Sequence, residues 1–547
     1  MPLGGVGEIG MNLYLYGYGP EGEREWLIVD MGITFGSEVE PGIDIILPDI
    51  RFLEEERPNL KGLLLTHAHE DHYGAVVDLW PRLGSVPVYA TPFTAAMLKS
   101  KLGATGLWRD FPLQIMPMGG RRRIGPFEVE LVSMSHSIPE PSAVVLRTDL
   151  GTVLHTGDWK LDENPLTSAP TDEARLRALG EEGITALICD STNAVRDGIS
   201  ASEADVAITL ERLIREAPNR VAVTTFASNV ARIRSVANAA RAARRELVVV
   251  GRAMHRVIEA AQETGYLDAD LRLLQETEFE KIPPRNVVTL CTGSQGESRA
   301  AMARIALNEH PNVSLDAGDR VIFSSRTIPG NERAVNRVQN GLADLGIEVI
   351  TDQDAAVHVS GHPRRGELEQ LYGWTRPAIA IPMHGEGRHL EAHARLAEAL
   401  GVRQVVRARN GTMVRLAPGP AAIIDDVPVG RLYRDGAIIT RADDGPVRDR
   451  RKLSFAGSVA VSLVLSEKGA LLADPEVALT GLPATDNRGT SFETLARDAA
   501  IGAIESIPRP RRKDQKLVSE AVRRSVRAAV NQAWGKKPVC SVLLTVL

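Results

Sequence analysis

Cysteine is scarce in this sequence. Only Cys189, Cys291 and Cys540 occur among 547 residues; they lie far apart, and none belongs to a Cys-x-x-Cys pair. That odd number and wide spacing are typical of reduced thiols in the core of a cytosolic protein. We therefore expect a cytoplasmic protein.

Long apolar runs and an excess of positive charge are also missing. No apolar stretch reaches the roughly 18 residues of a membrane span, and Met1–Gly4 shows neither region of a signal peptide. The sequence therefore predicts no contact with a membrane. A net charge of -6 argues against a globally basic nucleic-acid binder, but it leaves room for a local basic groove.

A dinucleotide-binding fingerprint is absent as well, although its letters occur. Gly5–Gly10 matches G-x-G-x-x-G, but only four residues precede it, and Met11–Tyr16 after it is strand-like rather than helical. The fingerprint requires a strand before it and a helix after it. We interpret the segment as a glycine-rich turn close to a site.

What the sequence does have is a dense cluster of histidines in residues 66–74. The apolar run Leu60–Leu65 before it predicts a buried strand, and the apolar spacing of Ala75–Trp80 after it predicts a helix. The cluster is therefore expected on a strand-to-helix loop. The helical zinc motif His-Glu-x-x-His is not present, because the segment His69–His72 is one residue too short.

The spacing inside this loop favours metal binding. His67 and His69 are two residues apart and point the same way on an extended chain, whereas Asp71 and His72 follow where the chain turns into the helix. This arrangement suits two ions a few ångströms apart better than one. Imidazole with carboxylate suits zinc, manganese or iron. Solvated loop histidines are the alternative, and the density of the cluster argues against them.

More histidines and aspartates stand where later predicted strands end. Strand-like segments run into His136, Asp158, Asp190, His362 and His384. His136 and Asp158 arrive while a two-ion site still lacks ligands, so we predict both as ligands. His384 can complete the site.

From about residue 201 the pattern changes to alternating strands and helices. This alternation predicts a parallel sheet and a second domain. Two of its predicted strands end in loops of small residues, Phe226–Asn229 and Gly293–Gly296. Small residues let backbone N–H groups approach an anion, although each loop alone is weak evidence.

Three segments of the chain are rich in charged residues. Arg121–Arg123 is expected in a solvated turn, and residues 434–452 are expected to be a linker. Residues 509–537 hold ten Lys or Arg against two acids, which fits either a solvated helix face or phosphate contact. The predicted domains are residues 1–200 with 366–433, then 201–365, and then 453–547 after the linker.

In order along the chain, these pieces resemble the ribonuclease J family, bacterial members of the metallo-β-lactamase superfamily with a β-CASP insertion. The matching motifs are Gly4–Asn12, His67–His72, Ser135–Pro139, His155–Asp158, Asp190–Asn193, Phe226–Asn229, Leu290–Glu297, His358–His362 and His384–Glu386. The resemblance implies an α/β fold: an αββα metallo-β-lactamase sandwich split by a β-CASP α/β domain, plus a small α/β C-terminal domain. One departure is Ala231, where the family often has histidine.

The resemblance also implies two divalent metal ions, zinc first, with manganese or magnesium as alternatives. It assigns His67, His69 and His136 to one ion, Asp71, His72 and His384 to the other, and Asp158 to both as a bridge. The ions would lower the pKa of the attacking water. Asp71 counts among the catalytic residues as well as the ligands.

The remaining predicted roles fall to His362 and its neighbours. By the resemblance, His362 protonates the leaving 3′-oxygen and Asp190 holds that imidazole, with general acid help of ~10²–10⁴-fold. His358 is the rival for the acid role. The predicted substrate-binding residues, around a pocket for the RNA 5′-phosphate, are Ser228, Asn229, Ser360, Gly361, His362 and His358.

The implied function is a metal-dependent ribonuclease with 5′→3′ exonuclease activity on single-stranded 5′-monophosphate RNA, and with endonuclease activity, in rRNA processing and mRNA decay. A homodimer or homotetramer is expected, and RNA-decay proteins are candidate partners. Three alternatives stay open: a DNA-directed β-CASP nuclease, a small-molecule metallo-hydrolase, and a non-catalytic scaffold. The small-molecule enzyme needs no insertion of this size between Asp158 and His384. The complete ligand set argues against the scaffold.

Overall fold

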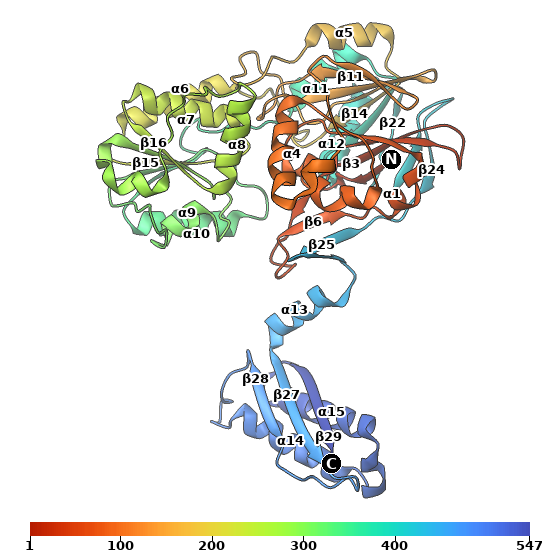
Figure 1. The fold of residues 1–547 in the computed structure, drawn as a ribbon, viewed down its shortest axis with the longest axis vertical. Helices are drawn as coiled ribbons and strands as arrows, with labels where there is room; N and C mark the ends of the chain where they lie inside the picture. Colours follow the sequence, from red (N-terminus) through yellow and green to blue (C-terminus); the bar gives the residue numbers. More distant parts are fainter. The chain divides into compact units, whose positions relative to one another are not determined.

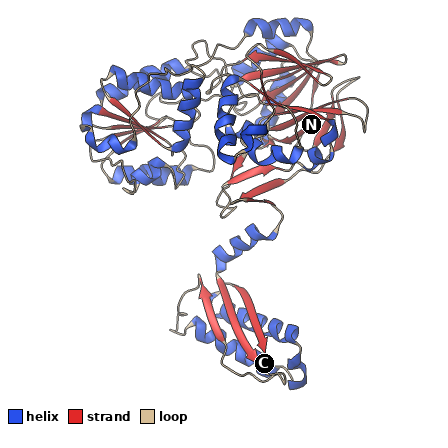
Figure 2. Ribbon diagram, in the orientation of Figure 1, coloured by secondary structure: helices blue, strands red, loops and turns tan.

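The computed structural model describes the whole chain, from Met1 to Leu547. It divides into two compact units: one joins Met1–Thr34 to Leu47–Arg431, and the other joins Phe35–Ile46 to Leu432–Leu547. Figure 1 labels the elements, and Figure 2 distinguishes helices from strands. None of the helices has both the length and the apolar character that crossing a bilayer requires.

The first unit contains a sandwich of two sheets. One sheet runs in the order β1 (Pro2–Gly4), β3 (Leu13–Tyr18), β4 (Glu25–Val29), β7 (Leu60–Leu64), β8 (Val88–Ala90) and β9 (Leu113–Ile115). The other runs in the order β10 (Arg121–Ile124), β11 (Phe127–Ser133), β12 (Ser142–Thr148), β13 (Gly151–His155), β14 (Ala186–Asp190), β20 (Ile379–Met383) and β22 (Gln404–Val405). Between them, Leu27, Val29 and Leu64 of the first sheet share one buried cluster with Val129 and Ile188 of the second.

Helices pack against the outer faces of this sandwich. They are α1 (Arg51–Glu55) and α4 (Pro92–Thr105) on the side of the first sheet, and α5 (Glu173–Glu182), α11 (Arg365–Thr375) and α12 (Gly387–Ala399) on the side of the second. Two short helices, α2 (Glu70–Tyr73) and α3 (Val76–Leu79), follow β7. Leu176 of α5 and Leu368 of α11 join Val145 and Leu187 of the second sheet in a buried cluster. The predicted αββα fold is confirmed.

The second sheet brings together segments that are far apart in the sequence. β14 and β20 are parallel, with Asp190 opposite Met383, although the whole inserted domain separates them in the chain. β13 is the other neighbour of β14 and is also parallel to it. Because parallel strands end at the same edge, the residues that follow β13, β14 and β20 meet at one place. Short strands complete this half: β2 (Val6–Gly7) with β21 (Gly385–Glu386), and β23 (Thr412–Arg415) with β24 (Ala422–Asp426).

The inserted domain is a parallel α/β layer structure, as predicted. Its five strands lie in the order β16 (Glu246–Val250), β17 (Val287–Cys291), β15 (Val221–Thr224), β18 (Arg320–Phe323) and β19 (Glu348–Ile350), all parallel. Figure 1 shows α6 (Glu203–Glu216) and α7 (Val230–Ala242) on one side of the sheet, and α9 (Ala301–Ala306) and α10 (Glu332–Asp344) on the other, with α8 (Arg252–Glu263) alongside. Both faces are covered, so the interiors of the strands are mostly apolar.

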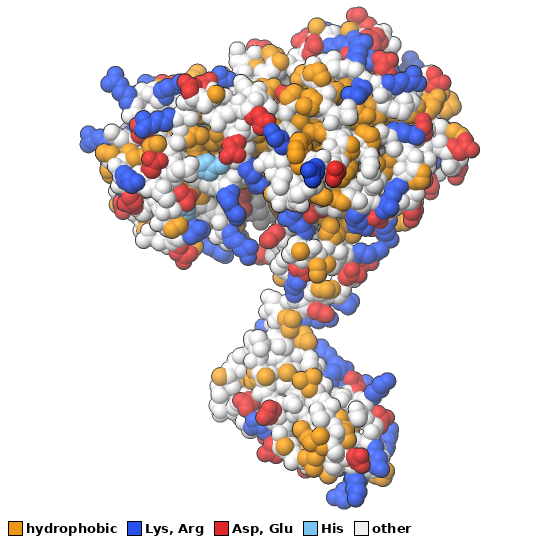
Figure 3. Space-filling model, in the orientation of Figure 1, with side chains coloured by type: hydrophobic (Ala, Val, Ile, Leu, Met, Phe, Trp, Pro, Cys, Tyr) orange, Lys and Arg blue, Asp and Glu red, His pale blue; other side chains and the backbone are white.

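The second unit is built around a three-stranded sheet. β27 (Ser458–Leu465) pairs antiparallel with β28 (Glu476–Thr480) and parallel with β29 (Val539–Val546). Every second residue of β27 is buried, in one cluster with residues of α14 (Phe492–Ser506) and α15 (Gln515–Trp534). Figure 3 shows hydrophobic side chains on the exposed surface of this unit. A separate sheet has the order β26 (Ile438–Arg441), β25 (Arg431–Asp435), β6 (Ile45–Pro48) and β5 (Thr34–Phe35).

Two polar segments differ from the expectation. Arg121–Arg123, expected in a solvated turn, lies in β10 opposite Glu128–Glu130 of β11. Cross-strand charge pairing explains this, since Arg121 lies 3.2 Å from the carboxylate of Glu130. Residues 434–452, expected to be a linker, hold the end of β25, all of β26 and much of α13 (Gly445–Ala456). The domain boundaries otherwise remain a prediction.

Candidate metal centre

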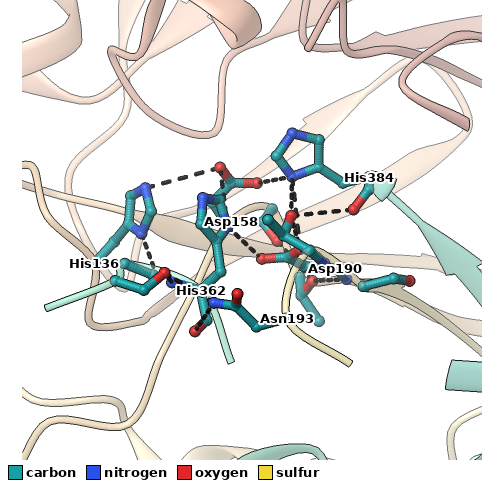
Figure 4. A network of polar contacts seen from close by, with 12 residues as sticks. His136, Asp158, Asp190, Asn193, His362 and His384 are labelled. Carbon is teal, nitrogen blue, oxygen red and sulfur yellow. Dashed lines mark hydrogen bonds and ion pairs between the residues drawn. The ribbon is translucent and has the colours of Figure 1, made fainter. Parts of the chain in front are cut away.

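All seven predicted metal ligands lie at one edge of the sandwich. They follow four different strands: β7 is followed by His67, His69, Asp71 and His72, β11 by His136, β13 by Asp158, and β20 by His384. Their ligand atoms form two groups, and Asp158 belongs to both. Figure 4 shows the imidazoles of His136, His362 and His384 gathered around the carboxylate of Asp158.

Three neutral imidazoles make up the first group together with Asp158. Nε2 of His67 lies 3.1 Å from Nδ1 of His69, which lies 3.0 Å from Nε2 of His136. Burial lowers the pKa of His69 to about 4, and it holds the pKa values of His67 and His136 well below the ordinary value. Three neutral imidazoles therefore converge, and the neutral imidazole is the form that binds a metal ion.

The second group holds Asp71, His72, Asp158 and His384. Nε2 of His72 lies 3.2 Å from Oδ2 of Asp158, and Nδ1 of His384 lies 3.0 Å from its Oδ1. Burial opposes charge on His72 and His384, but Asp158 and the other nearby carboxylates raise both pKa values well above the ordinary value. The carboxylates thus create a potential that attracts a cation.

Asp158 occupies the middle of the cluster. Its Oδ2 lies 3.9 Å from Nε2 of His67 and 3.8 Å from Nε2 of His136, in addition to the contact with His72. Burial alone would raise the pKa of this carboxyl, yet His384 and His72 hold it well below the ordinary range. Asp158 is therefore ionised and reaches both groups of imidazoles.

The cluster fits divalent metal ions by its own chemistry. Oδ1 of Asp158 and Nε2 of His384 are buried and form no hydrogen bond; their nearest charged partners are Nδ1 of His384 at 3.0 Å and Oδ2 of Asp71 at 3.3 Å. Unsatisfied buried polar atoms are rare in native structures, and a cation at this position would satisfy both. The donor set of imidazole nitrogen and carboxylate oxygen suits zinc and related ions.

Residues behind the ligands fix the orientation of the ligand side chains. The residue among them with the most hydrogen bonds to this loop, Asp30, was not predicted from the sequence. Asp30, just after β4, accepts hydrogen bonds from the backbone and hydroxyl of Thr66 at 2.8 and 2.9 Å and from Nδ1 of His72 at 2.7 Å. Thr66 Oγ1 lies 3.0 Å from Nδ1 of His67. Asp30 ends a strand as Asp158 and Asp190 do, and this signal would have identified it.

Two glycines permit the close packing of the centre. A Cβ atom on Gly361 would lie 2.5 Å from Cε1 of His136, and one on Gly32 would lie 1.6 Å from the carbonyl oxygen of Asp71. The carbonyl of Gly361 also accepts a hydrogen bond of 2.6 Å from Nδ1 of His136. That bond leaves Nε2 of His136 free to face the centre.

His362 stands beside the centre, outside the two groups that hold the predicted ligands. With Asp158, Asp190 and His384 it forms a third group of atoms that could hold a metal ion. Its Nδ1 lies 2.8 Å from Oδ2 of Asp190, and Asp190 Oδ1 accepts bonds of 2.9 and 2.7 Å from the backbone and hydroxyl of Thr192. The side chain is 21% exposed, more than the buried ligands. Burial would lower the pKa of His362, but Asp190 and Asp158 raise it above the ordinary value. His362 is therefore equipped to carry and release a proton.

The predicted 5′-phosphate pocket draws on two segments. Ser228 and Asn229 follow β15, and Asn229 caps α7 by accepting a 2.9 Å bond from the backbone of Arg232. Ser360 precedes His362, and its hydroxyl accepts a 2.8 Å bond from Asn193. The buried guanidinium of Arg232 donates at 2.7 Å to the carbonyl of Val357, so one side chain ties the two segments together.

Two other positions singled out in the sequence, His358 and Ala231, make no hydrogen bond to the site. Nδ1 of His358 is buried without a hydrogen bond. Burial, and to a smaller extent the positive charge of Arg232, holds the pKa of His358 well below the ordinary value. A neutral His358 is a poorer proton donor than His362. Ala231, at the position where the family often has histidine, is buried in the inserted domain.

Family models match most of the chain. Residues 9–194 match the metallo-beta-lactamase superfamily, residues 218–342 the ribonuclease J beta-CASP domain, and residues 346–407 the Zn-dependent metallo-hydrolase RNA specificity domain. Residues 445–546 match the ribonuclease J C-terminal domain. These matches follow the order that the motifs predicted.

Curated relatives match over nearly the full length. The chain is 55% identical to a ribonuclease J of Sinorhizobium meliloti, covering 100% of this chain and 96% of the relative. It is 39% identical to a ribonuclease J of Mycolicibacterium smegmatis, over 98% and 95%, and 35% identical to one of Thermus thermophilus, over 98% and 93%.

A solved structure of a protein of unknown function from Enterococcus faecalis shares the fold. Its TM-score is 0.50 at 16% identity, with coverage of 77% of this chain and 98% of that one. Fold, motif order and full-length identity agree, and this chain belongs to the ribonuclease J family, a family of metal-dependent ribonucleases built from metallo-β-lactamase and β-CASP domains.

Proposed function

We propose that this chain hydrolyses RNA as a 5′→3′ exonuclease that prefers 5′-monophosphate ends, and as an endonuclease, in RNA processing and decay. The observation that carries this proposal is that the candidate metal ligands and the candidate proton donor are different residues at the same centre. Asp158 is shared by the two groups that contain the seven predicted ligands, whereas His362 lies with Asp158, Asp190 and His384 in a third group. We assign His362 to the proton and not to an ion because its Nδ1 is bound by Asp190 at 2.8 Å. A hydrolase of phosphodiesters needs both a cation site and a separate proton donor for the leaving oxygen.

We assign the seven ligands as the sequence predicted, with His67, His69 and His136 on one side of Asp158 and Asp71, His72 and His384 on the other. Two divalent ions, zinc first, would supply the Lewis acidity that lowers the pKa of the attacking water.

His362 supplies the proton to the leaving 3′-oxygen. Asp190 binds Nδ1 of its ring at 2.8 Å, so the protonated Nε2 is left for the substrate. Loss of such a proton donor lowers a rate by ~10²–10⁴-fold. Asp190 acts by positioning this ring.

The preference for a 5′-monophosphate rests on the donors of the two segments. Ser228, Ser360 and the side-chain NH2 group of Asn229 offer hydrogen bonds to phosphate oxygens, whereas the backbone N–H of Asn229 already donates to the carbonyl of Phe226 at 3.1 Å. A 5′-hydroxyl leaves such donors unpaired, at ~1–3 kcal/mol for each buried group. A triphosphate adds bulk and charge that a pocket of this kind resists.

A time course on 5′-monophosphate, 5′-triphosphate and 5′-hydroxyl RNA, with product sizing and a DNA strand of the same sequence, tests the proposal. We expect mononucleotides first from the 5′-monophosphate RNA. The double variant Ser228→Ala/Ser360→Ala should lose this preference and keep internal cleavage. Equal rates on all three 5′ ends would contradict the pocket, and faster cleavage of DNA would contradict the choice of substrate.

A further inference from the structure

Two arginines lie directly beside the segment that carries His362. Arg364 follows it by two residues. Arg196 belongs to the loop after β14: its backbone N–H donates to the carbonyl of Asn193 at 2.8 Å, and its own carbonyl accepts from Arg365 at 3.0 Å. Asn193 in turn donates to the carbonyl of His362 at 3.1 Å, as Figure 4 shows. The two arginines are therefore fixed by the same network that holds the candidate proton donor.

A third arginine reaches this place from the inserted domain. Arg326 follows β18, and its carbonyl accepts a 2.9 Å bond from the side chain of Gln295. Ser324, two residues earlier, donates at 2.7 Å to the carbonyl of Val357, at the start of the segment that ends in His362. Arg326 thus stands at the carboxyl edge of the parallel sheet, where ligand sites of such sheets form.

These three guanidinium groups have no acidic partner. Other partly buried arginines of this unit are paired; Arg175 lies 2.7 Å from Glu130 and Arg320 lies 2.8 Å from Glu348. No carboxylate lies within ion-pair distance of Arg196, Arg326 or Arg364, and Nε of Arg364 is buried without a hydrogen bond.

The charges of the group act on one another. Burial lowers the pKa of Arg196, and the positive charges of Arg326, Arg364 and Arg388 lower it further, while Asp352 opposes them. Like charges held together in a half-buried place repel each other. An anion bound among them would remove that repulsion, and the oxygens of a phosphate match the geometry of a guanidinium group.

We propose that Arg196, Arg326 and Arg364 bind an internucleotide phosphate of the RNA strand, at a site next to His362 and separate from the pocket for the terminal phosphate. This inference rests on the proposed function for the identity of the anion. It adds a contact that is indifferent to the chemistry of the 5′ end. The arginines would hold the strand in register with the proton donor.

Binding of labelled RNA to the full chain, with EDTA present to prevent cleavage, tests the site. Fluorescence anisotropy is measured from low to high KCl for one oligonucleotide with a 5′-hydroxyl, a 5′-monophosphate or a 5′-triphosphate. The variant Arg196→Gln/Arg326→Gln/Arg364→Gln should weaken binding by on the order of tenfold for each guanidinium removed. The slope of log Kd against log salt should fall by roughly 0.7, the change that accompanies the loss of one single-strand phosphate contact.

The matched control is Arg177→Gln/Arg212→Gln/Arg395→Gln, which removes the same charge from exposed surface pairs. It should leave both quantities nearly unchanged. The charge-preserving variant with three lysines should keep the salt slope and lose part of the affinity. Circular dichroism checks folding, and the single variant Arg196→Gln replaces the triple one if that does not fold.

An unchanged Kd and salt slope in a folded triple variant would overturn the site. A loss confined to the 5′-triphosphate oligonucleotide would also overturn it, because the arginines would then read terminal phosphates only. Failure of the proposed function looks different: the unmodified protein would bind RNA but, with metal restored, leave it uncut.

Discussion

At the scale of single residues, the nitrogens turned away from the centre matter as much as those turned toward it. Nδ1 of His72 donates to Asp30, and Nδ1 of His136 donates to Gly361. Each bond fixes the tautomer and leaves the other nitrogen for a metal ion. The ligands themselves were predictable because each follows an apolar strand. Asp30 also follows an apolar strand, but no histidine lies next to it in the sequence, so the sequence pattern did not indicate a site there.

Replacement of Asp30 is therefore expected to affect the metal centre without removing a ligand. Asp30→Ala should weaken metal affinity by ~10–100-fold, since His72 and Thr66 lose their acceptor. Competition with a chromophoric chelator measures this. Asp149→Ala, which removes an exposed carboxylate bound to Tyr18, is the control. Equal affinities in the two variants would show that Asp30 does not support the centre.

Replacement of a ligand should have a larger effect. Asp158→Ala or His67→Ala is expected to abolish RNA cleavage and lower the bound metal, while the fold stays largely intact, because the side chains serve the centre rather than the apolar core. Elemental analysis and circular dichroism accompany the assay. Near-normal turnover with full metal content would contradict the assignment.

His362 should separate rate from metal content. His362→Ala is expected to keep its metal and lose ~10²–10⁴-fold in rate, because the Nδ1 atom of His362 is bound by Asp190 and each of the two groups of predicted ligands is complete without this ring. His358→Ala is the comparison, since His358 is the rival for the acid role. If His362→Ala instead lost one equivalent of metal, the ring would be a ligand and His384 would need a new role.

At the scale of elements, one buried ion pair joins several parts of the inserted domain. Arg232 of α7 lies 3.0 Å from Glu203, the first residue of α6, and donates to the carbonyls of Ser324 and Val357 at 2.8 and 2.7 Å. Both side chains are buried. The pair therefore ties two helices, the end of β18 and the segment before His362 into one body.

Breaking this pair should cost much more than breaking a surface pair. Glu203→Gln leaves the Arg232 guanidinium buried without its counter-ion, at ~3–5 kcal/mol of unfolding free energy. Urea unfolding measures the change. Arg212→Gln, which breaks the exposed pair with Glu216 at 3.0 Å, should cost ~0–1 kcal/mol. Similar losses in both variants would mean that the buried pair contributes no more than a surface one.

Strand and helix patterns predicted most elements, because burial imposes its period on the sequence. The strand expected over Leu60–Leu65 is β7, which ends at Leu64, and the helix expected over Ala75–Trp80 is α3, which spans Val76–Leu79. Arg121–Arg123 was misassigned, since its partners Glu128–Glu130 become visible only when the hairpin is paired. Arg232 was not singled out for the same reason, because the partners of its side chain come from three places in the chain.

At the scale of the whole molecule, the second unit contributes no ligand to the metal centre. β29 is an edge strand of its sheet, so one row of its backbone groups is unpaired. Leu543 in this strand is 64% exposed. An apolar edge of this kind suits contact with a second copy of the chain.

Removal of residues 453–547 is therefore expected to lower the subunit count of the protein. Leu543→Glu should weaken the same contact within the full-length chain, and Leu307→Glu, at an exposed leucine of the first unit, is the control. Light scattering measures the mass of each. A truncated chain that kept the full count would place the contact elsewhere.

The bond between His136 and the carbonyl of Gly361 joins residues 225 positions apart. One partner is a candidate ligand from the first domain, and the other belongs to the segment proposed to hold the RNA. This hydrogen bond therefore connects the metal site to the segment proposed to bind RNA. If the two binding events are coupled, each changes the affinity of the other by the same factor. If loading the centre orders this segment and so tightens RNA binding, then bound RNA must slow the loss of metal by the same coupling free energy. An enzyme working on long transcripts would in that case keep its metal best, when metal is scarce, while RNA is bound.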